Sequence, residues 1–92
     1  MPLYTFIMDY LGGTYISQVR ASTPRSAARA WARQLDYAPV WGLGKAGKEQ
    51  LIEWMMNGYS DPVPITGVKN TWCCGALVRN KSMDINFVQT EE

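Results

Sequence analysis

Three arginines, Arg25, Arg29 and Arg33, recur at four-residue intervals. On a helix, residues four apart lie on one face, so the three guanidinium groups would form a single row. Arginine binds phosphate and carboxylate groups through paired N–H donors, which makes such a row a candidate surface for nucleic acid or for a protein partner. A solvated helix face, or ion pairs with Glu49 and Glu53 of a second predicted helix or of a neighbouring subunit, would explain the same spacing.

Three further basic residues could extend this row to a nucleic-acid backbone: Arg20, Lys45 and Lys48. Residues 20 to 48 hold six basic residues against Asp36 alone, a balance of +5, which leaves −4 for the rest of a chain whose net charge is +1. Such a split can mark an anionic partner or the attraction of two parts of one fold. The net charge itself is far below that of most nucleic-acid-binding domains.

Tryptophan is the second residue type here that suits a binding surface, because its ring anchors protein interfaces and stacks on nucleic-acid bases. Of the four tryptophans, Trp31 and Trp54 fall on apolar faces of predicted helices, where core packing explains them. Trp41 lies in a loop with glycine and proline, beside Val40 and Leu43. Trp41 is therefore the tryptophan best suited to an interface, with packing in the core or against its own loop as the alternative.

The stretch from residue 42 to 47, Gly-Leu-Gly-Lys-Ala-Gly, matches the spacing G-x-G-x-x-G and precedes a predicted helix, where free amides favour phosphate. The dinucleotide-binding pattern also needs a preceding strand and a parallel βαβ unit, which the chain lacks. Glu49 stands where the phosphate-loop pattern needs a magnesium-binding hydroxyl. We therefore expect a loop leading into a helix, and no cofactor.

The inventory of catalytic side chains is small. Histidine is absent, which excludes His-based triads and His metal ligands. Cys73 and Cys74 are adjacent, so they are poor disulfide partners for each other, and they do not make a four-ligand zinc site. Glu49 and Glu53 share a helix edge that solvent exposure explains. We expect reduced cysteines and a protein that is not an enzyme and binds no metal.

Two predicted hairpins and two predicted helices must position these residues. Aromatic and β-branched residues flank Gly12 and Gly13, which is typical of a hairpin whose turn needs positive φ. Thr23 can cap a helix with Pro24 at its first position, and Gly58 suits the end of a second helix. The expected elements are strands 3–9 and 14–20, helices 23–37 and 45–57, a loop 59–67, strands 70–79 and 83–88 joined by a turn at 80–82, and a solvated tail 89–92.

This order predicts a single α+β domain over residues 1–92, with the order β-β-α-α-β-β and an antiparallel sheet of about four strands carrying both helices on one face. The hairpins must meet side by side or pair with another copy. No stretch approaches the roughly 18 apolar residues of a membrane span, and no signal peptide is evident, so we expect a cytoplasmic protein. The side chains expected to face the core are Tyr4, Phe6, Met8, Ala27, Ala28, Trp31, Leu35, Trp72, Cys74, Ala76, Val78, Met83, Ile85 and Phe87.

Residues Tyr4 to Asp9, Gly12 to Tyr15 and Thr23 to Ala28 form a short hairpin with a glycine turn that leads into a helix introduced by threonine. In this layout the first 37 residues resemble HicB-like antitoxin domains. The chain departs from that family where arginines replace the glutamates of the first helical turn, and it lacks the DNA-binding C-terminal segment of many members. The resemblance implies a partner-binding or regulatory module without catalysis, of double-stranded-RNA-binding-like or RNase-H-like topology. The second helix and the final hairpin lie outside it.

Two hypotheses for function follow. The first is a non-enzymatic interaction or regulatory module that self-associates or binds a protein partner, through strand edges, the Trp41 loop or the arginine row. The alternative is a nucleic-acid-binding domain that uses the helix of residues 23 to 37.

Overall fold

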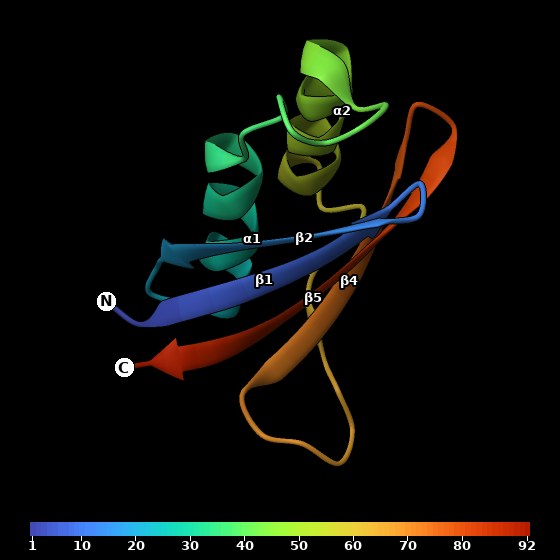
Figure 1. Cartoon of the computed structure of the whole chain (residues 1–92). Helices are drawn as coiled ribbons and strands as arrows, with labels where there is room; N and C mark the ends of the chain where they lie inside the picture. Colours follow the sequence, from blue (N-terminus) through green and yellow to red (C-terminus); the bar gives the residue numbers. More distant parts are fainter.

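The computed structural model describes all 92 residues as a sheet with two helices packed on one face (Figure 1). The predicted α+β class and the placement of both helices are confirmed. The sheet has five strands rather than four, because two residues within the predicted loop 59–67 pair with the strand that follows. The elements are β1 (Leu3–Tyr10), β2 (Gly13–Arg20), α1 (Pro24–Gln34), α2 (Gly44–Met56), β3 (Val63–Pro64), β4 (Thr71–Val78) and β5 (Lys81–Glu91).

The strands follow the order β2-β1-β5-β4-β3, and every neighbouring pair is antiparallel. The two hairpins therefore meet side by side within one chain, through β1 and β5, with Phe6 opposite Phe87. This pairing brings the chain ends next to each other (Figure 1). It also leaves β2 and β3 as the two edges of the sheet.

Both hairpins turn through two residues with positive φ, the conformation of the turns that match the twist of paired strands. The first turn has Leu11 at 49° and Gly12 at 81°. The second has Arg79 at 52° and Asn80 at 64°, so it begins one residue before the predicted turn at 80–82. Gly12 supplies positive φ as expected, but the second residue that does so is Leu11 and not Gly13.

The C-terminal residues are not a solvated tail, so that prediction was wrong. Strand β5 continues to Glu91 because β1 offers partners beyond Val88, which lies opposite the first residue of β4: Gln89 lies opposite Tyr4, and Glu91 lies opposite Leu3. The pairing of β1 with β5 was not predictable from the periodicity of either strand alone.

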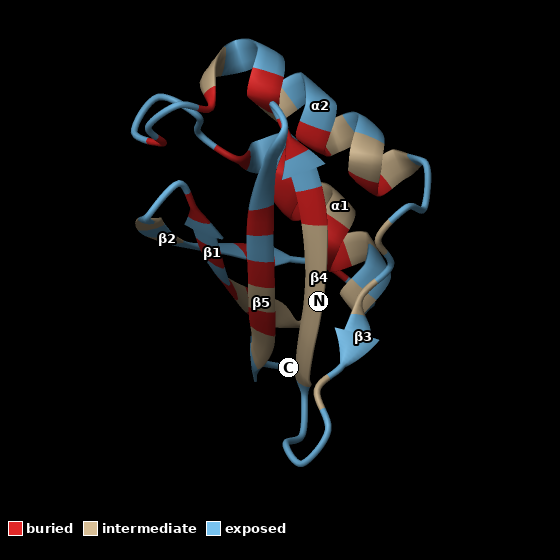
Figure 2. Ribbon diagram, turned by 90° about the vertical axis from the view of Figure 1, so that its right-hand side faces the viewer, coloured by how far each residue is buried: buried red, intermediate tan, exposed pale blue.

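The core lies between the sheet and the helices, and the alternate residues Met83, Ile85 and Phe87 of β5 are buried in it (Figure 2). An aromatic stack forms its centre: Phe6 lies between Trp31, at a centroid distance of 5.1 Å, and Phe87, at 4.3 Å. Of the side chains expected to pack in the core, Trp54, Trp72 and Cys74 are half-buried and pack against it, and all the others are buried.

Local signals at the helix ends act as expected. The Thr23 hydroxyl accepts a hydrogen bond from the Ser26 N–H at 3.1 Å, and the Ser26 hydroxyl accepts one from the Thr23 N–H at 3.0 Å, which forms a capping box. Helix α1 ends at Gln34, three residues before the predicted end. Helix α2 is followed by Gly58 with a φ of 71°, the left-handed residue predicted there.

Candidate partner-binding edge of the sheet

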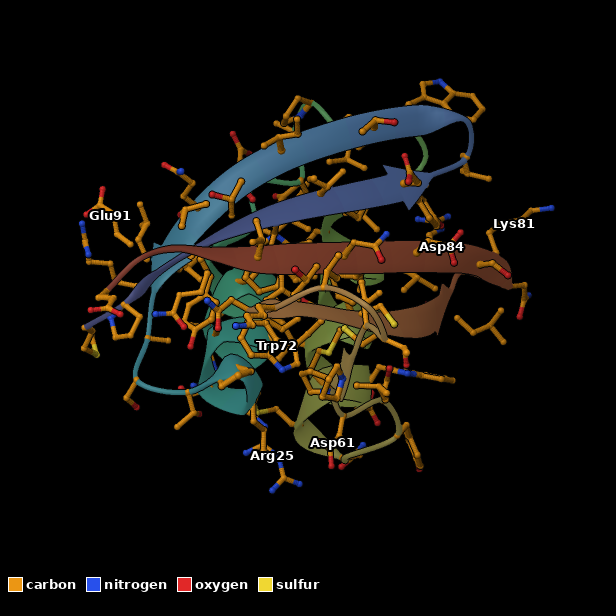
Figure 3. All side chains as sticks on the ribbon, turned by 90° about the horizontal axis from the view of Figure 1, so that it is seen from below. Arg25, Asp61, Trp72, Lys81, Asp84 and Glu91 are labelled. Carbon is orange, nitrogen blue, oxygen red and sulfur yellow. The ribbon has the colours of Figure 1, made fainter.

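The predicted arginine row faces other parts of the same chain. Arg25 forms a two-point ion pair with Asp61, with distances of 3.2 Å from Nε to Oδ1 and 3.0 Å from Nη2 to Oδ2 (Figure 3). Arg29 is half-buried, and its Nε is buried without a hydrogen-bond partner. The Nη2 of Arg33 approaches the Met56 sulfur at 3.3 Å. The α1 row therefore packs toward α2 and the loop that follows it.

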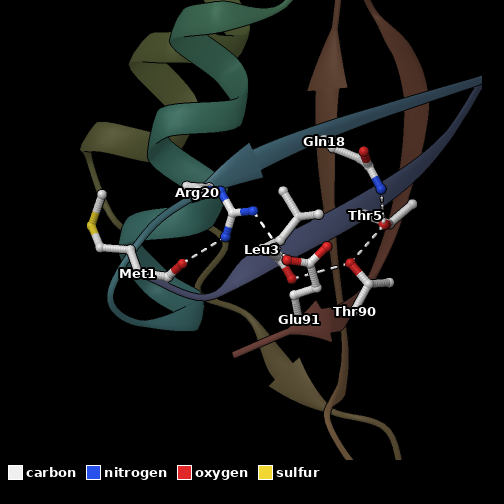
Figure 4. A network of polar contacts seen from close by, with 7 residues as sticks. All are labelled: Met1, Leu3, Thr5, Gln18, Arg20, Thr90 and Glu91. Carbon is white, nitrogen blue, oxygen red and sulfur yellow. Dashed lines mark hydrogen bonds and ion pairs between the residues drawn. The ribbon is translucent and has the colours of Figure 1, made fainter.

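The remaining basic residues lie apart from this row. Arg20 is at the end of β2, where its guanidinium donates to the Met1 carbonyl at 2.9 Å and pairs with Glu91 at 3.1 Å (Figure 4). Because its neighbour Val19 is buried toward the helices, Arg20 lies on the opposite face of the sheet from α1. Lys45 is exposed and Lys48 is half-buried, both near the start of α2. The six basic residues do not form one continuous surface.

Trp41 is displayed to solvent, with 74% of its surface exposed. Its neighbours Val40 and Leu43 are buried and fix the loop between α1 and α2. The backbone N–H of Trp41 donates to the Tyr15 hydroxyl at 3.2 Å, which ties this loop to β2. The predicted interface residue is thus exposed next to the first hairpin, whereas Trp31 is fully buried as expected.

Strand β2 is a long edge without the features that usually protect one. It pairs with β1 in unbroken register from Leu3 opposite Arg20 to Tyr10 opposite Gly13, so no bulge bends it away. Between Gly13 and Val19 it contains no charged residue and no proline. Ile16 lies in the middle of the strand with 68% of its surface exposed. Unprotected edges of this kind offer backbone N–H and C=O groups to an added strand.

The other edge of the sheet is protected. Strand β3 is two residues long, Val63 and Pro64, and Pro62 precedes it. Proline has no N–H to donate and is typical of blunted edges. Residues 74 to 78 of β4 lie beyond β3 and have no strand partner, although the Gly75 N–H there donates to the Ser60 hydroxyl. Strand β2 is therefore the longer edge that remains available.

Two hollows follow β2 on the side of the sheet that carries the helices. The larger, of about 330 Å³, is lined by residues 14 to 17 of β2 and by Leu35, Asp36, Pro39 and Val40. The smaller, of about 180 Å³, is lined by residues 17 to 19 of β2 and by Trp31, Gln34, Leu35 and Asp36. Helix α1 and the loop after it therefore leave space for side chains of a strand added to β2.

The face of the sheet away from the helices, here the open face, carries no further layer (Figure 1). Its central row crosses all five strands and consists of Ile16, Ile7, Asn86, Cys73 and Val63. Ile16, Ile7 and Val63 are exposed at 68%, 37% and 58% respectively. The apolar end of the row at Ile16 coincides with the unprotected edge.

A second row on the open face brings two carboxylates together. Asp9 lies directly opposite Asp84, and Thr14 lies on the other side of Asp9. The Thr14 hydroxyl donates to the Asp9 carboxylate, and neither aspartate forms an ion pair. Like charges directly opposite each other are destabilising, so this row lacks a countercharge within one chain.

Where the open face meets the loop from Tyr59 to Val63, a hollow of about 660 Å³ is lined by Asp9, Asp84, Asp61 and Cys73 among others. No three His, Cys, Asp or Glu side chains come together in a way that could hold a metal ion.

Cys73 lies on the open face, whereas its neighbour Cys74 lies on the opposite face of β4 and packs against the core. Burial raises the pKa of its thiol from the usual 9.0 to about 12; the Cys73 thiol also raises it, and the Ser60 hydroxyl opposes the shift. Burial similarly raises the pKa of the Tyr10 hydroxyl, which donates to the Val78 carbonyl at 2.8 Å.

Comparison of the chain with protein-family models, curated proteins and solved structures finds no match in any of the three. The resemblance of the first 37 residues to HicB-like domains stays a prediction. Neither helix has the length and apolar character needed to span a bilayer.

The sequence alone did not predict that β2 is an edge of the sheet. Residues 14 to 20 were predicted as a strand, but its place at the edge depends on the pairing of β1 with β5. Two features of the sequence indicate this edge. The segment between Gly13 and Val19 has no charged residue and no proline, and Pro62 and Pro64 prevent a long strand from forming at the opposite edge of the sheet.

Proposed function

We propose that this protein is a non-enzymatic interaction module that binds a protein partner by adding an extended strand to β2. One observation carries the proposal: β2 is a long, unbroken and unprotected edge, whereas β3 at the other side is short and rich in proline. Strand addition supplies affinity through backbone hydrogen bonds, and pockets for alternate side chains supply specificity. The two hollows beside β2 and the exposed Ile16 provide such contacts on both faces.

Exposed Trp41 supports the same role. It lies on the loop that the Tyr15 hydroxyl ties to β2, so a partner seated on this edge would meet an aromatic anchor nearby. The proposal also assigns the protein to the cytoplasm, where the free thiols of Cys73 and Cys74 would stay reduced.

The substitution Ile16→Lys tests the proposal, because a charged side chain on an edge strand opposes strand addition. Ile16→Lys changes a residue that is already exposed, so the fold should persist. Val63→Lys is the matched control: Val63 is similarly exposed and lies at the opposite edge. We expect the wild type and Val63→Lys to self-associate or retain a protein partner, and Ile16→Lys to do neither. If Ile16→Lys and Val63→Lys self-associate or retain the partner equally, β2 is not the binding edge.

Nucleic-acid binding through α1 is the alternative, and it has less support because Arg25 is paired with Asp61 and Arg29 is half-buried. Titration of short single- and double-stranded RNA and DNA, followed by anisotropy at low and moderate salt, separates the two. We expect no binding at low salt. Binding that falls with salt by a slope of about −0.7 to −0.9 per phosphate, and that a folded Arg25, Arg29, Arg33→Gln triple variant loses, would favour the alternative.

A further inference from the structure

We infer that the strand added to β2 is β2 of a second copy of this chain, paired antiparallel about a two-fold axis at Ser17. The inference rests on the proposed function and specifies its partner. It joins two five-stranded sheets into one continuous sheet, with the helices of both copies on the same side.

The parity of the strand limits the register. Opposed residues in an antiparallel pair direct their side chains to the same face, so even-numbered residues of β2 must oppose even-numbered residues of the second copy. An axis at Ser17 satisfies this condition and opposes Thr14 with Arg20, and Ile16 with Gln18. It engages residues 14 to 20 of both strands, which is nearly the whole of β2.

Charge complementarity favours this register. In one copy, the row of Thr14, Asp9 and Asp84 ends at the β2 edge and has no cation. The axis at Ser17 places Arg20 of the second copy next to Thr14, at the end of this row. Within one copy its guanidinium turns inward to Glu91. In the dimer we expect it to extend across Thr14 toward Asp9 of the other copy, where a positive charge offsets the repulsion between the two aspartates.

The exposed side chains of β2 also complement those of β2 in the second copy. Ile16 of one copy is the diagonal neighbour of Ile16 of the other, within reach across paired strands, so both lose solvent exposure. On the helix side, Tyr15 and Val19 of each copy lie opposite Val19 and Tyr15 of the other, beside the two hollows.

Sedimentation of the purified chain from about 1 μM to about 1 mM tests the inference in the range where weak dimers form. We expect a dimer for the wild type and for Val63→Lys, and a monomer for Ile16→Lys. Arg20→Gln should weaken the dimer at least tenfold. Circular dichroism checks that each variant is folded.

Cysteines introduced one at a time, in a chain whose own Cys73 and Cys74 are replaced by alanine, test the register. Across a two-fold axis, only the residue on the axis faces its own copy at the spacing of a disulfide. Mild oxidation should therefore cross-link Ser17→Cys through position 17, identified by mass spectrometry of the linked peptide, and should not cross-link Ile16→Cys or Gln18→Cys. Cross-linking of Ile16→Cys or Gln18→Cys instead would overturn the register centred on Ser17.

The outcomes separate this inference from the proposed function. A wild type that stays monomeric at every concentration, yet retains another protein that Ile16→Lys loses, would overturn the second copy as partner and leave strand addition at β2 standing. A dimer that Ile16→Lys does not disrupt would place the dimer contact elsewhere and overturn the inference. A monomer that retains no partner would overturn both.

Discussion

The side chain of Leu11 lies over Gly42, so that a Cβ added to Gly42 would stand 2.6 Å from Leu11 Cδ1. Leu11 belongs to the β1–β2 turn and Gly42 to the loop between α1 and α2, and both have positive φ, 49° and 79°. This contact joins the hairpin to the loop that borders the β2 edge. The positive φ at position 42 is the reason that this contact depends on a glycine there.

Gly42→Ala should destabilise the fold by about 1–2 kcal/mol, because an L-residue pays this to adopt the left-handed conformation. The clash with Leu11 should add little, since the end of a leucine side chain can shift. Urea unfolding measures the loss. Gly75→Ala is the control: its Cβ would meet the Met83 carbonyl at an ordinary 3.5 Å and its φ is not positive, so the change should stay within about 0.5 kcal/mol. A Gly42→Ala variant as stable as the wild type would contradict the role of φ at this position.

Ser17 has a structural role within one copy. Its Oγ accepts a hydrogen bond from Trp31 Nε1 at 3.0 Å, and Trp31 is the indole stacked on Phe6 in the core. Ser17→Ala leaves this buried donor without a partner and should cost about 1–2 kcal/mol. Denaturant unfolding at a dilution where the chain is monomeric measures the cost without a contribution from association. Ser82→Ala, at an exposed serine without a side-chain hydrogen bond, should be nearly neutral.

The start of α1 offers a test of a feature read directly from the sequence. Thr23→Ala removes the hydroxyl that accepts from the Ser26 N–H, and should cost about 1 kcal/mol. For a domain of this size, that loss lowers the thermal midpoint by about 4–8 °C. Thr23→Ser keeps the hydroxyl and should keep most of the stability. Equal midpoints for the alanine and serine variants would show that the cap contributes nothing.

Features that depend on residues close together in the chain can be predicted from the sequence. The Thr23 cap, the left-handed Gly58 and the buried face of β1 are local, because each depends on residues within a few positions of each other. Periodicity predicts which face of a strand is buried, but not which strand lies beside it. The adjacency of β1 and β5, and therefore the edge position of β2, depends on a pairing between opposite ends of the chain.

In the candidate site, too, contacts between side chains far apart in the sequence were not predicted. The arginine row lies on one helix as predicted, but Glu49 and Glu53, one alternative set of partners, do not pair with it within the chain. Arg25 reaches Asp61, 36 residues away, because the loop after α2 returns beside the start of α1. Strand β3 was missed because Pro62 and Pro64 favour a loop, and only its pairing with Trp72 and Cys73 makes it a strand.

The buried Cys74 thiol predicts how stability depends on pH. Its pKa is about 12 in the folded chain, against the usual 9.0, so between these values the folded state keeps a proton that the unfolded state loses. Stability is therefore fully present below pH 9 and falls as pH rises above it, by up to about 1.4 kcal/mol per pH unit. Urea unfolding between pH 7 and 10.5 measures this slope. Cys74→Ala should flatten it, whatever its stability at pH 7, whereas Cys73→Ala, which changes the thiol on the open face, should retain most of it. An unchanged slope in Cys74→Ala would assign the alkaline loss to the buried tyrosines Tyr4 and Tyr10, whose pKa values burial also raises.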